Sequence, residues 1–358
     1  MKQSVTILFG IFLLLAGTIA CDQDKEEVLI WTDPPSDSIP TYTNPVFVPD
    51  LADPTIVRGK DKWFYAYGTE NTWFEGIHRV TPIIKSRDLV NWEYVGDAFE
   101  TKPSWKEGGI WAPDVSFYNE KYYLFYSLST WGDNNPGIGL ATSPSPLGPF
   151  VGQGKFLDSE STNVGNSIDP FFYYEGEGRN MKFYLFWGSF RGIYGIELNK
   201  DISGFVGDKF RIGGDMFEAT YIYKKDGYYY FFGSSGSCCD GPDSKYRVMI
   251  ARSANIKGPY LDKEGRDISV QGVPATLFLK GDGIRFVGPG HNGEIIVDDN
   301  GDEWFLYHAI EKDNPYLPGG ATRRPLMLDK IKWDDEGWPY LEGDVPSTSV
   351  QEGPYFKK

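Results

Sequence analysis

The chain has 358 residues, and its 35 Lys and Arg against 50 Asp and Glu give a formal net charge of -15. Nucleic acids and anionic membranes are poor partners for such an acidic protein, because phosphate binding needs a basic face, whereas a neutral sugar polymer is not excluded. The 42 Gly, 24 Pro and 16% aromatic residues favour short strands joined by turns over long helices.

The N-terminal segment MKQSVTILFGIFLLLAGTIAC resembles a bacterial lipoprotein signal ending at Cys21, which would become the lipidated N-terminus. Its apolar run, 5–16, is shorter than a membrane-spanning helix. We therefore predict an exported protein held by a lipid at the outer membrane, on its periplasmic or surface face. The alternative is an ordinary secretory signal and a periplasmic or secreted protein. Residues 22–45 are expected to be a flexible tether and 46–358 the folded domain.

Five aromatic runs recur along the chain at intervals of 45 to 76 residues. They are WFYAYG (63–68), YYLFYS (122–127), FYLFWG (183–188), YYYFFG (228–233) and WFLYHA (304–309). Turn residues precede each run, and in four repeats a further strand and a Ser/Asp/Pro/Gly corner follow it. Self-similarity at this period predicts an all-β fold, a five-bladed β-propeller. A β-sandwich is the main alternative, but five such units exceed its usual number of strands.

The residues just before each aromatic run are expected to converge, because the first strand of a propeller blade lines the central axis. These residues include Asp53, Asp114, Asp169, Glu218 and His291. Buried charges are costly unless they are paired or used. A cluster of carboxylates raises some pKa values and leaves other members ionised. Glycoside hydrolysis uses such a pair, a carboxylic acid that protonates the leaving oxygen and a carboxylate on the opposite side.

The chain resembles the family 43 glycoside hydrolases, five-bladed propellers that cleave plant polysaccharides containing arabinose or xylose. The resemblance rests on ADPTI (52–56), WAPDV (111–115), NSIDP (166–170), FEATYI (217–222) and GPGHNG (288–293). It implies hydrolysis with inversion and without a cofactor for the chemistry. By motif position it implies that Asp53 is the general base, Glu218 the general acid and Asp169 the carboxylate that orients the acid and raises its pKa.

Three longer stretches are most similar to the endo-acting α-1,5-L-arabinanases, at 122–150, 233–265 and 288–296. The implied substrate is arabinan, a neutral polysaccharide, or arabinoxylan. An exo-acting α-L-arabinofuranosidase or β-xylosidase is the alternative, since these enzymes share the same three carboxylates. The segment 307–333 departs from the arabinanase pattern, and its Gly319-Gly320 and Arg323-Arg324 could reshape a subsite. A surface glycan-binding propeller without catalysis is a third hypothesis.

Further site residues are expected around the carboxylates. Trp111 is the best candidate for stacking on a sugar ring, ahead of Trp73, Trp131 and Trp187, for which packing between blades is the commoner fate. Asp114 and Arg191 are expected to contact substrate, although a structural role for Asp114 is equally open. The resemblance implies that His291 contacts a structural calcium ion on the axis, mostly through water ligands. The adjacent Cys238 and Cys239 could be reduced or bonded to each other.

Overall fold

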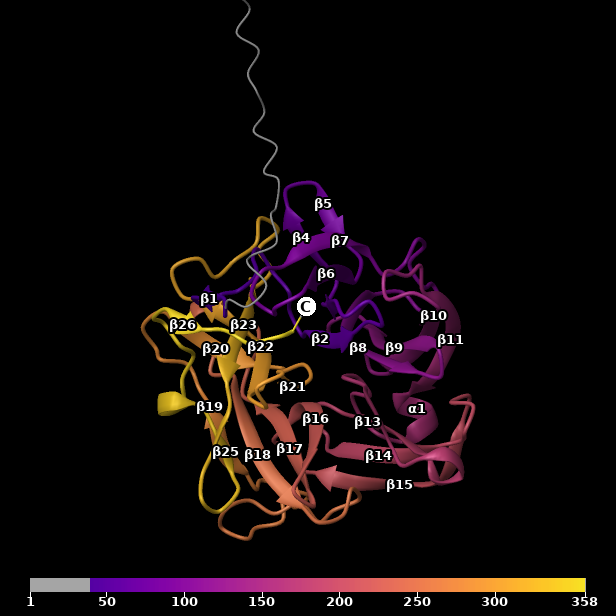
Figure 1. Cartoon of the computed structure of the whole chain (residues 1–358). Helices are drawn as coiled ribbons and strands as arrows, with labels where there is room; N and C mark the ends of the chain where they lie inside the picture. The colour runs from indigo at the N-terminus through magenta and orange to yellow at the C-terminus, as the bar shows by residue number, and fades with distance from the viewer. Residues whose placement is uncertain (1–38, 358) are drawn as a thin grey trace, which may run out of the picture. The chain divides into compact units, whose positions relative to one another are not determined.

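The computed structural model describes residues 39–357. Within that range it contains five four-stranded antiparallel sheets (Figure 1), so the predicted five-bladed propeller is confirmed. The first sheet consists of β2 (Thr55–Arg58), β3 (Phe64–Tyr67), β6 (Pro82–Ser86) and β7 (Glu93–Asp97). The second consists of β8 (Gly109–Tyr118), β9 (Lys121–Ser129), β10 (Gly137–Ser143) and β11 (Val151–Asp158).

The next two blades repeat this order, from the axis outward. Blade three consists of β12 (Phe171–Glu175), β13 (Lys182–Trp187), β14 (Ile193–Leu198) and β15 (Phe205–Gly213). Blade four consists of β16 (Glu218–Lys225), β17 (Tyr228–Ser235), β18 (Arg247–Ser253) and β19 (Thr276–Leu279). The short elements between them are β4 (Asn71–Phe74), β5 (Ile77–Arg79), α1 (Ser159–Thr162), η1 (Gly178–Asn180) and η2 (Gly241–Asp243).

The inner strand of the fifth blade is interrupted. Both β20 (Phe286–Gly290) and β21 (Ile296–Val297) pair with β22 (Glu303–Glu311), which also pairs with β23 (Leu326–Lys330). The chain then forms the hairpin of β24 (Lys332–Trp333) and β25 (Pro339–Tyr340), followed by η3 (Glu342–Asp344). The interruption spans 291–295 and begins at His291, so it brings His291 to the axis between the two halves of the strand.

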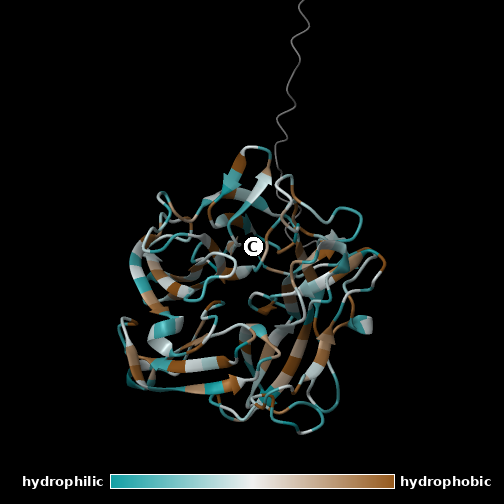
Figure 2. Ribbon diagram, turned by 180° about the vertical axis from the view of Figure 1, so that it is seen from behind, coloured by the Kyte–Doolittle hydropathy of each residue, from teal (hydrophilic) through white to brown (hydrophobic). Residues whose placement is uncertain are grey.

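Each predicted aromatic run is the second strand of its blade, and the reason is packing. The second strand lies inside the sheet and is covered on both faces, so neighbouring residues of one strand are both apolar. In β17, for example, Phe231 and Phe232 are both fully buried, and Phe232 packs against Phe305 of the next blade. Burying such a side chain stabilises the fold by about 1.5–3 kcal/mol. Figure 2 shows brown hydrophobic bands along these strands.

The ring is closed by residues close to the start of the described chain. Phe47 forms an antiparallel bridge with Leu326 in the fifth blade, and β1 (Thr41–Tyr42) pairs with β26 (Gln351–Glu352). The expected tether over 22–45 therefore needs correction at its end, because residues 41–45 belong to the folded domain. Residues 22–38 of that segment, the signal and Cys21 lie outside the described residues. Among residues 39–357, no helix has the length and apolar character needed to cross a membrane.

Candidate active site

The inner strand of every blade has a non-glycine residue with a left-handed backbone either within it or at most two residues away from it, and these residues surround the axis. They are Asp53 (φ 54°), Ala112 (φ 44°), Asp169 (φ 56°), Ala219 (φ 56°) and His291 (φ 43°). Non-glycine residues adopt this conformation rarely, Asp and His more readily than most, and such residues cluster at functional sites. Glu218 comes one residue before this position in its blade, and Asp114 comes two residues after it.

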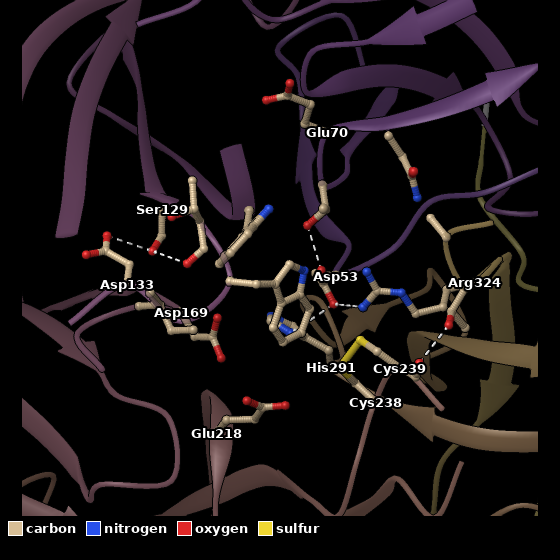
Figure 3. Close-up of a pocket in the computed structure, with 18 of the residues that line it drawn as sticks. Asp53, Glu70, Ser129, Asp133, Asp169, Glu218, Cys238, Cys239, His291 and Arg324 are labelled. Atoms are coloured by element: carbon tan, nitrogen blue, oxygen red, sulfur yellow. Dashed lines mark hydrogen bonds and ion pairs between the residues drawn. A yellow bond between two sulfur atoms is a disulfide. The ribbon is translucent and has the colours of Figure 1, made fainter. Parts of the chain in front are cut away.

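Asp53, Asp169, Glu218 and His291 line one cavity of about 620 Å³. Figure 3 shows the three carboxylates approaching the same space from different parts of the ring. All three are at least nine-tenths buried. The structure therefore brings together the three residues that the sequence predicted as base, acid and orienting carboxylate.

Asp53 is surrounded by hydrogen-bond donors. Arg324 Nη1 donates to its Oδ1 at 2.7 Å, Thr69 Oγ1 donates to its Oδ2 at 2.6 Å, and His291 Nδ1 lies 3.2 Å from Oδ1. Burial by itself would raise the pKa of Asp53, but Arg324 and His291 together hold this pKa well below its usual 3.8. Asp53 is therefore ionised at the pH values at which proteins work, as a general base must be.

The pKa values of the two histidines beside Asp53 are shifted in opposite directions. His308 Nδ1 accepts a hydrogen bond from the Asp53 backbone N–H at 3.0 Å, so this nitrogen carries no proton. Burial, assisted by Arg324, lowers the pKa of His308 well below 6.5, and its 3.4 Å approach to Asp53 Oδ1 is not an ion pair. For His291, burial would lower the pKa, but the charge of Asp53 raises it overall. Asp53 therefore favours the protonated form of His291, whereas His308 stays neutral and holds the backbone.

Asp169 and Glu218 form the opposite half of the site, and the structure links them through the backbone. Asp169 Oδ2 accepts a hydrogen bond from the N–H of Ala219, the residue after Glu218, at 3.2 Å. Burial, assisted by the charges of Glu218 and Asp53, raises the pKa of Asp169 to about 7. Burial likewise raises the pKa of Glu218, against the effect of Ser189, whose Oγ donates to Oε2 at 2.7 Å. The pair therefore retains a proton at a pH where Asp53 is ionised.

This arrangement suits acid–base hydrolysis. The ionised Asp53 can take a proton from an attacking water, and Glu218 can give a proton to a leaving oxygen. Enzymes that use two carboxyl groups in this way keep one protonated and one ionised through their environments. Here burial and the like charges of neighbouring carboxylates keep a proton on the pair Asp169 and Glu218. Arg324 and His291 keep Asp53 ionised.

The other predicted contacts have different outcomes. Trp111 lines the cavity beside Trp131, with ring centroids 5.7 Å apart. Trp131 is 82% exposed, whereas Trp73 and Trp187 are buried in the packing of the blades. Arg191 is exposed and does not line the cavity. The buried Ser189, two positions before Arg191, contacts Glu218 instead.

Asp114 was expected in the same cavity, and this expectation needs correction. It lines a separate axial cavity of about 20 Å³ together with Glu294, His291 and Asn292, and its Oδ2 accepts from the Phe172 N–H at 2.7 Å. The reason is its position two residues beyond the left-handed turn. Each strand residue advances the chain by about 3.3 Å, so Asp114 lies at another level of the axis.

The calcium ion that the family resemblance implies would lie in this axial cavity, so the oxygen atoms lining the cavity decide whether it fits. Asn292 Oδ1 and Thr220 Oγ1 line it and are buried without a hydrogen-bond partner among the described atoms. Oxygen atoms of this kind suit a hard cation or water. In residues 39–357, however, no three His, Cys, Asp or Glu side chains are placed to hold a metal together. These side chains therefore do not form a calcium cage by themselves, so an ion here would depend on water ligands, and no step of the chemistry is assigned to an ion.

Sequence reasoning missed several residues of the site. Arg324 was noted only as a residue that could reshape a subsite, yet it pairs with Asp53, the predicted base. Tyr246 was not singled out. Its ring stacks on His308 with centroids 5.9 Å apart, and burial, assisted by the charge of Glu218, raises its pKa well above 10. Neither residue lies in a motif next to a carboxylate, so the sequence offered no local signal for them.

A disulfide joins the adjacent residues Cys238 and Cys239, which answers the question that the sequence left open. Both residues line the cavity of the three carboxylates (Figure 3). They lie in the loop between β17 and β18, the blade that carries Glu218.

Comparisons with known proteins identify the family of the chain. The model of the glycosyl hydrolases family 43 matches residues 42–339. An extracellular exo-alpha-(1->5)-L-arabinofuranosidase of Cellvibrio japonicus is 33% identical, over 82% of this chain and 86% of that protein. An extracellular endo-alpha-(1->5)-L-arabinanase of Bacillus subtilis is 34% identical, over 81% and 87%.

A solved structure extends the likeness to three dimensions. The α-L-arabinanase of Cellvibrio cellulosa, complexed with arabinohexaose, superposes with a TM-score of 0.70 at 30% identity, covering 82% of this chain and 96% of that one. The region that the family model matches, residues 42–339, includes all five blades and the three carboxylates. The chain therefore belongs to glycosyl hydrolase family 43 and is a glycoside hydrolase.

Proposed function

We propose that this protein hydrolyses α-1,5-linked L-arabinan with inversion at the anomeric carbon. Asp53 takes the proton of the attacking water, Glu218 protonates the leaving oxygen, and Asp169 holds the backbone beside Glu218 and helps to keep it protonated. The observation that carries the proposal is the division of the cavity into an ionised carboxylate, paired with Arg324, and a buried pair of carboxyls that retains a proton. Inversion needs this division, with water admitted between base and sugar.

Arabinan is the proposed polymer because two relatives, one exo-acting and one endo-acting, are both named for α-1,5-linked L-arabinose. The chain is also acidic, so a neutral substrate suits it. We propose endo action, with exo action on arabinan or on xylose-containing substrates as the alternative. The sequence identities to the endo- and exo-acting relatives differ by one percentage point. This difference does not favour either mode of action.

Product analysis over time tests the proposal. Linear arabinan is incubated with the protein, and aryl α-L-arabinofuranoside and aryl β-D-xyloside are run beside it. A ladder of arabino-oligosaccharides in the first minutes supports endo action, and free arabinose alone supports exo action. Proton NMR of the first product gives the anomeric outcome. Binding of arabino-oligosaccharides by calorimetry without any turnover would establish a binding protein and refute the proposed reaction.

The Glu218→Gln variant tests the assignment of the acid. Gln is nearly the same size and can accept the hydrogen bond of Ser189, so the fold should be retained. Hydrolysis of arabinan should fall by about 10²–10⁴-fold. Unchanged hydrolysis by a correctly folded variant would remove Glu218 from the mechanism.

Two further parts of the proposal concern the setting of the enzyme. We propose export and attachment through a lipid on Cys21, supported by the sequence of residues 1–21 and by relatives named as extracellular. A Cys21→Ser variant should lose labelling by palmitate and leave the membrane fraction.

A calcium ion at the axis would be held largely through water. Its test is a fall in melting temperature after treatment with a chelator and recovery on adding calcium alone.

A further inference from the structure

We propose that a groove on the fifth blade, toward the other end of its strands from the three carboxylates, is a second binding site for a neutral sugar chain. Residues of the turn 298–302 and of the segment 341–353 line this fifth-blade groove, together with Tyr42 and Trp304. The inference rests on the proposed function for the identity of the sugar, which is arabinan. It adds a site where the polymer is held but not cut.

The fifth-blade groove is a separate cavity. Its volume is about 780 Å³, and among residues 39–357 it shares no lining residue with the cavity of about 620 Å³ that contains the carboxylates. Trp304 and Lys330 form a pair across β22 and β23, and both line the groove. His308, which accepts the hydrogen bond of the Asp53 N–H, lies four residues further along β22, about 13 Å away. A sugar ring in the groove therefore does not touch the catalytic carboxyls.

The floor of the groove is aromatic and its rim has apolar surface. The rings of Tyr42 and Trp304 meet edge to face with centroids 6.3 Å apart, and both side chains are buried. The pairing of β1 with β26 brings the segment after η3 to these rings, and Figure 1 shows β1 and β26 together at the edge of blade five. Ile39 and Val350 line the groove and are exposed. Such surfaces can meet the apolar faces of sugar rings.

Hydrogen bonds hold the wall formed by the C-terminal segment. Asn44 Nδ2 donates to Ser347 Oγ at 3.0 Å and to Asp329 Oδ2 at 3.1 Å. Tyr307 donates to the same carboxylate oxygen at 2.7 Å. Asn44, Tyr307 and Asp329 are all buried. A wall that is already fixed binds a ligand without the entropic cost of ordering a loop.

The charges of the groove do not suit an anionic ligand. Lys330 Nζ lies 2.6 Å from Asp302 Oδ2, and Lys332 pairs with Glu342, so the two lysines among the described lining residues are neutralised by acids of the same groove. The other charged residues that line it are all acidic, and they are Asp298, Asp329 and Glu352. A phosphate or carboxylate would therefore meet net negative charge here.

A metal ion does not suit the groove either. Both oxygens of Asp298 are occupied, because they accept hydrogen bonds from Trp304 Nε1 and from three backbone N–H groups, those of Asn300, Asp302 and Tyr355. Within 39–357 no three His, Cys, Asp or Glu side chains are placed to hold a metal. The groove is therefore left with neutral ligands.

The exposed groups of the rim match a ligand that carries hydroxyl groups. They include the amide of Asn300, the hydroxyl of Thr348 and the carboxylate of Glu352, all on exposed residues. Amides and hydroxyls both donate and accept hydrogen bonds, and a carboxylate accepts them. A neutral chain of hydroxyl-bearing rings can use all three. The arabinan of the proposed function has this chemistry.

A second site affects polymers and short oligosaccharides differently. A polymer that is bound at the groove stays near the catalytic cavity, which raises its effective concentration there. Arabinotriose is too short to occupy both sites at once, so it gains nothing from the groove. The role of the groove is therefore visible as a difference between these two substrates.

The first test counts the binding sites. Calorimetry with arabinohexaose uses Glu218→Gln, which should bind the sugar without cutting it, and two sites are expected. Adding Thr348→Trp, which fills the groove, should remove the second site. Adding Asn300→Ala/Glu352→Ala should weaken it by about tenfold through the loss of two hydrogen bonds. The matched control is Gln153→Ala/Asp208→Ala, an exposed amide and an exposed carboxylate that line neither cavity, and it should keep both sites.

The second test is kinetic and uses Glu218 intact. Asn300→Ala/Glu352→Ala should lower kcat/KM on linear arabinan by about tenfold and leave kcat/KM on arabinotriose within about twofold of the wild type. Melting temperatures show that the variants are folded. Equal losses on both substrates, or no loss on arabinan, would overturn the role of the groove in holding the polymer.

The outcomes separate this inference from the proposed hydrolysis. One binding site in Glu218→Gln, or a second site that neither set of substitutions changes, would overturn the inference and leave the hydrolysis untouched. Two sites in a protein whose wild type does not cut arabinan would refute the reaction and support the groove. Absence of any binding and of any hydrolysis would refute both.

Discussion

Arg324 Nη1 lies 2.7 Å from Asp53 Oδ1, although the two residues are 271 positions apart in the chain. Both side chains are buried, and the Arg324 backbone N–H donates to the neighbouring carboxylate of Asp50 at 2.6 Å. The guanidinium offsets the cost of burying two acids next to each other. It also keeps the proposed base ionised, so one contact serves both stability and chemistry.

We expect Arg324→Gln to lower kcat/KM by about 100-fold, because Asp53 loses both its orientation and the charge that holds its pKa down. The variant should also unfold more easily, by about 3–5 kcal/mol, since a buried carboxylate is left unpaired. Steady-state kinetics and thermal denaturation measure the two effects. Arg323→Gln is the matched control, because Arg323 pairs with Glu311 at 2.8 Å instead. Similar kinetic losses in the two variants would contradict a specific role for Arg324.

The acid and the base can be separated by the choice of leaving group. Glu218→Gln should hydrolyse a dinitrophenyl α-L-arabinofuranoside within about tenfold of the wild type, because that leaving group needs little protonation. Asp53→Asn should lose activity on this substrate and on arabinan alike, since attack by water is impaired for both. The same loss for Glu218→Gln on both substrates would contradict its role as the acid. Circular dichroism spectra of the variants control for folding.

The pH profile should fall on its alkaline side as the carboxyl pair loses its proton. The pKa of Asp169 is raised to about 7 and that of Glu218 is also raised, so activity should decline from neutral pH upward. Asp53, with its lowered pKa, should remain ionised well into the acid range. The enzyme is therefore expected to work best in weakly acidic to neutral solution, and the profile of kcat/KM against pH measures this.

Ser189→Ala should move the alkaline side of that profile upward, by about one pH unit. Ser189 Oγ donates to Glu218 Oε2 and stabilises the ionised carboxylate, so its removal raises the pKa of the acid further. Ser253→Ala is the control, since the Ser253 hydroxyl accepts from Asn255 N–H at an outer corner of the blade. A downward shift in Ser189→Ala would show that the sign of this interaction is wrong.

The Asp114 and Glu294 carboxyls should make stability fall as the pH rises. Burial raises the pKa of Asp114 well above 3.8 and that of Glu294 to about 7. The folded protein therefore holds protons that the unfolded chain releases between about pH 4 and 7, and stability is lost over that window. Asp114→Asn should flatten this loss by about 1 kcal/mol at pH 8. Melting curves from pH 5 to 8 test this, with the exposed Asp201→Asn as control.

The sequence predicted the repeats well because the signals are local. An aromatic strand between a turn and a Ser/Asp/Pro/Gly corner specifies a blade whatever the rest of the chain does, and five of them specify the ring. The motifs also placed Asp53, Asp169 and Glu218 near the axis, since each lies at or next to the same backbone turn. Asp114 does not line the cavity of the three carboxylates, and the sequence did not reveal this because a motif match does not give the level on the axis that a side chain reaches.

The sequence by itself therefore determined the architecture, the family and the three carboxyl groups, because patterns of a few residues encode strands, turns and motifs. Only the tertiary structure decided the ionisation of those groups and the shape of the space around them. Arg324 reaches Asp53 through closure of the ring, Ser189 reaches Glu218 from a neighbouring blade, and the disulfide meets Thr322 across two loops. Burial and charge act through space, so the residues that set them need not be near one another in the chain.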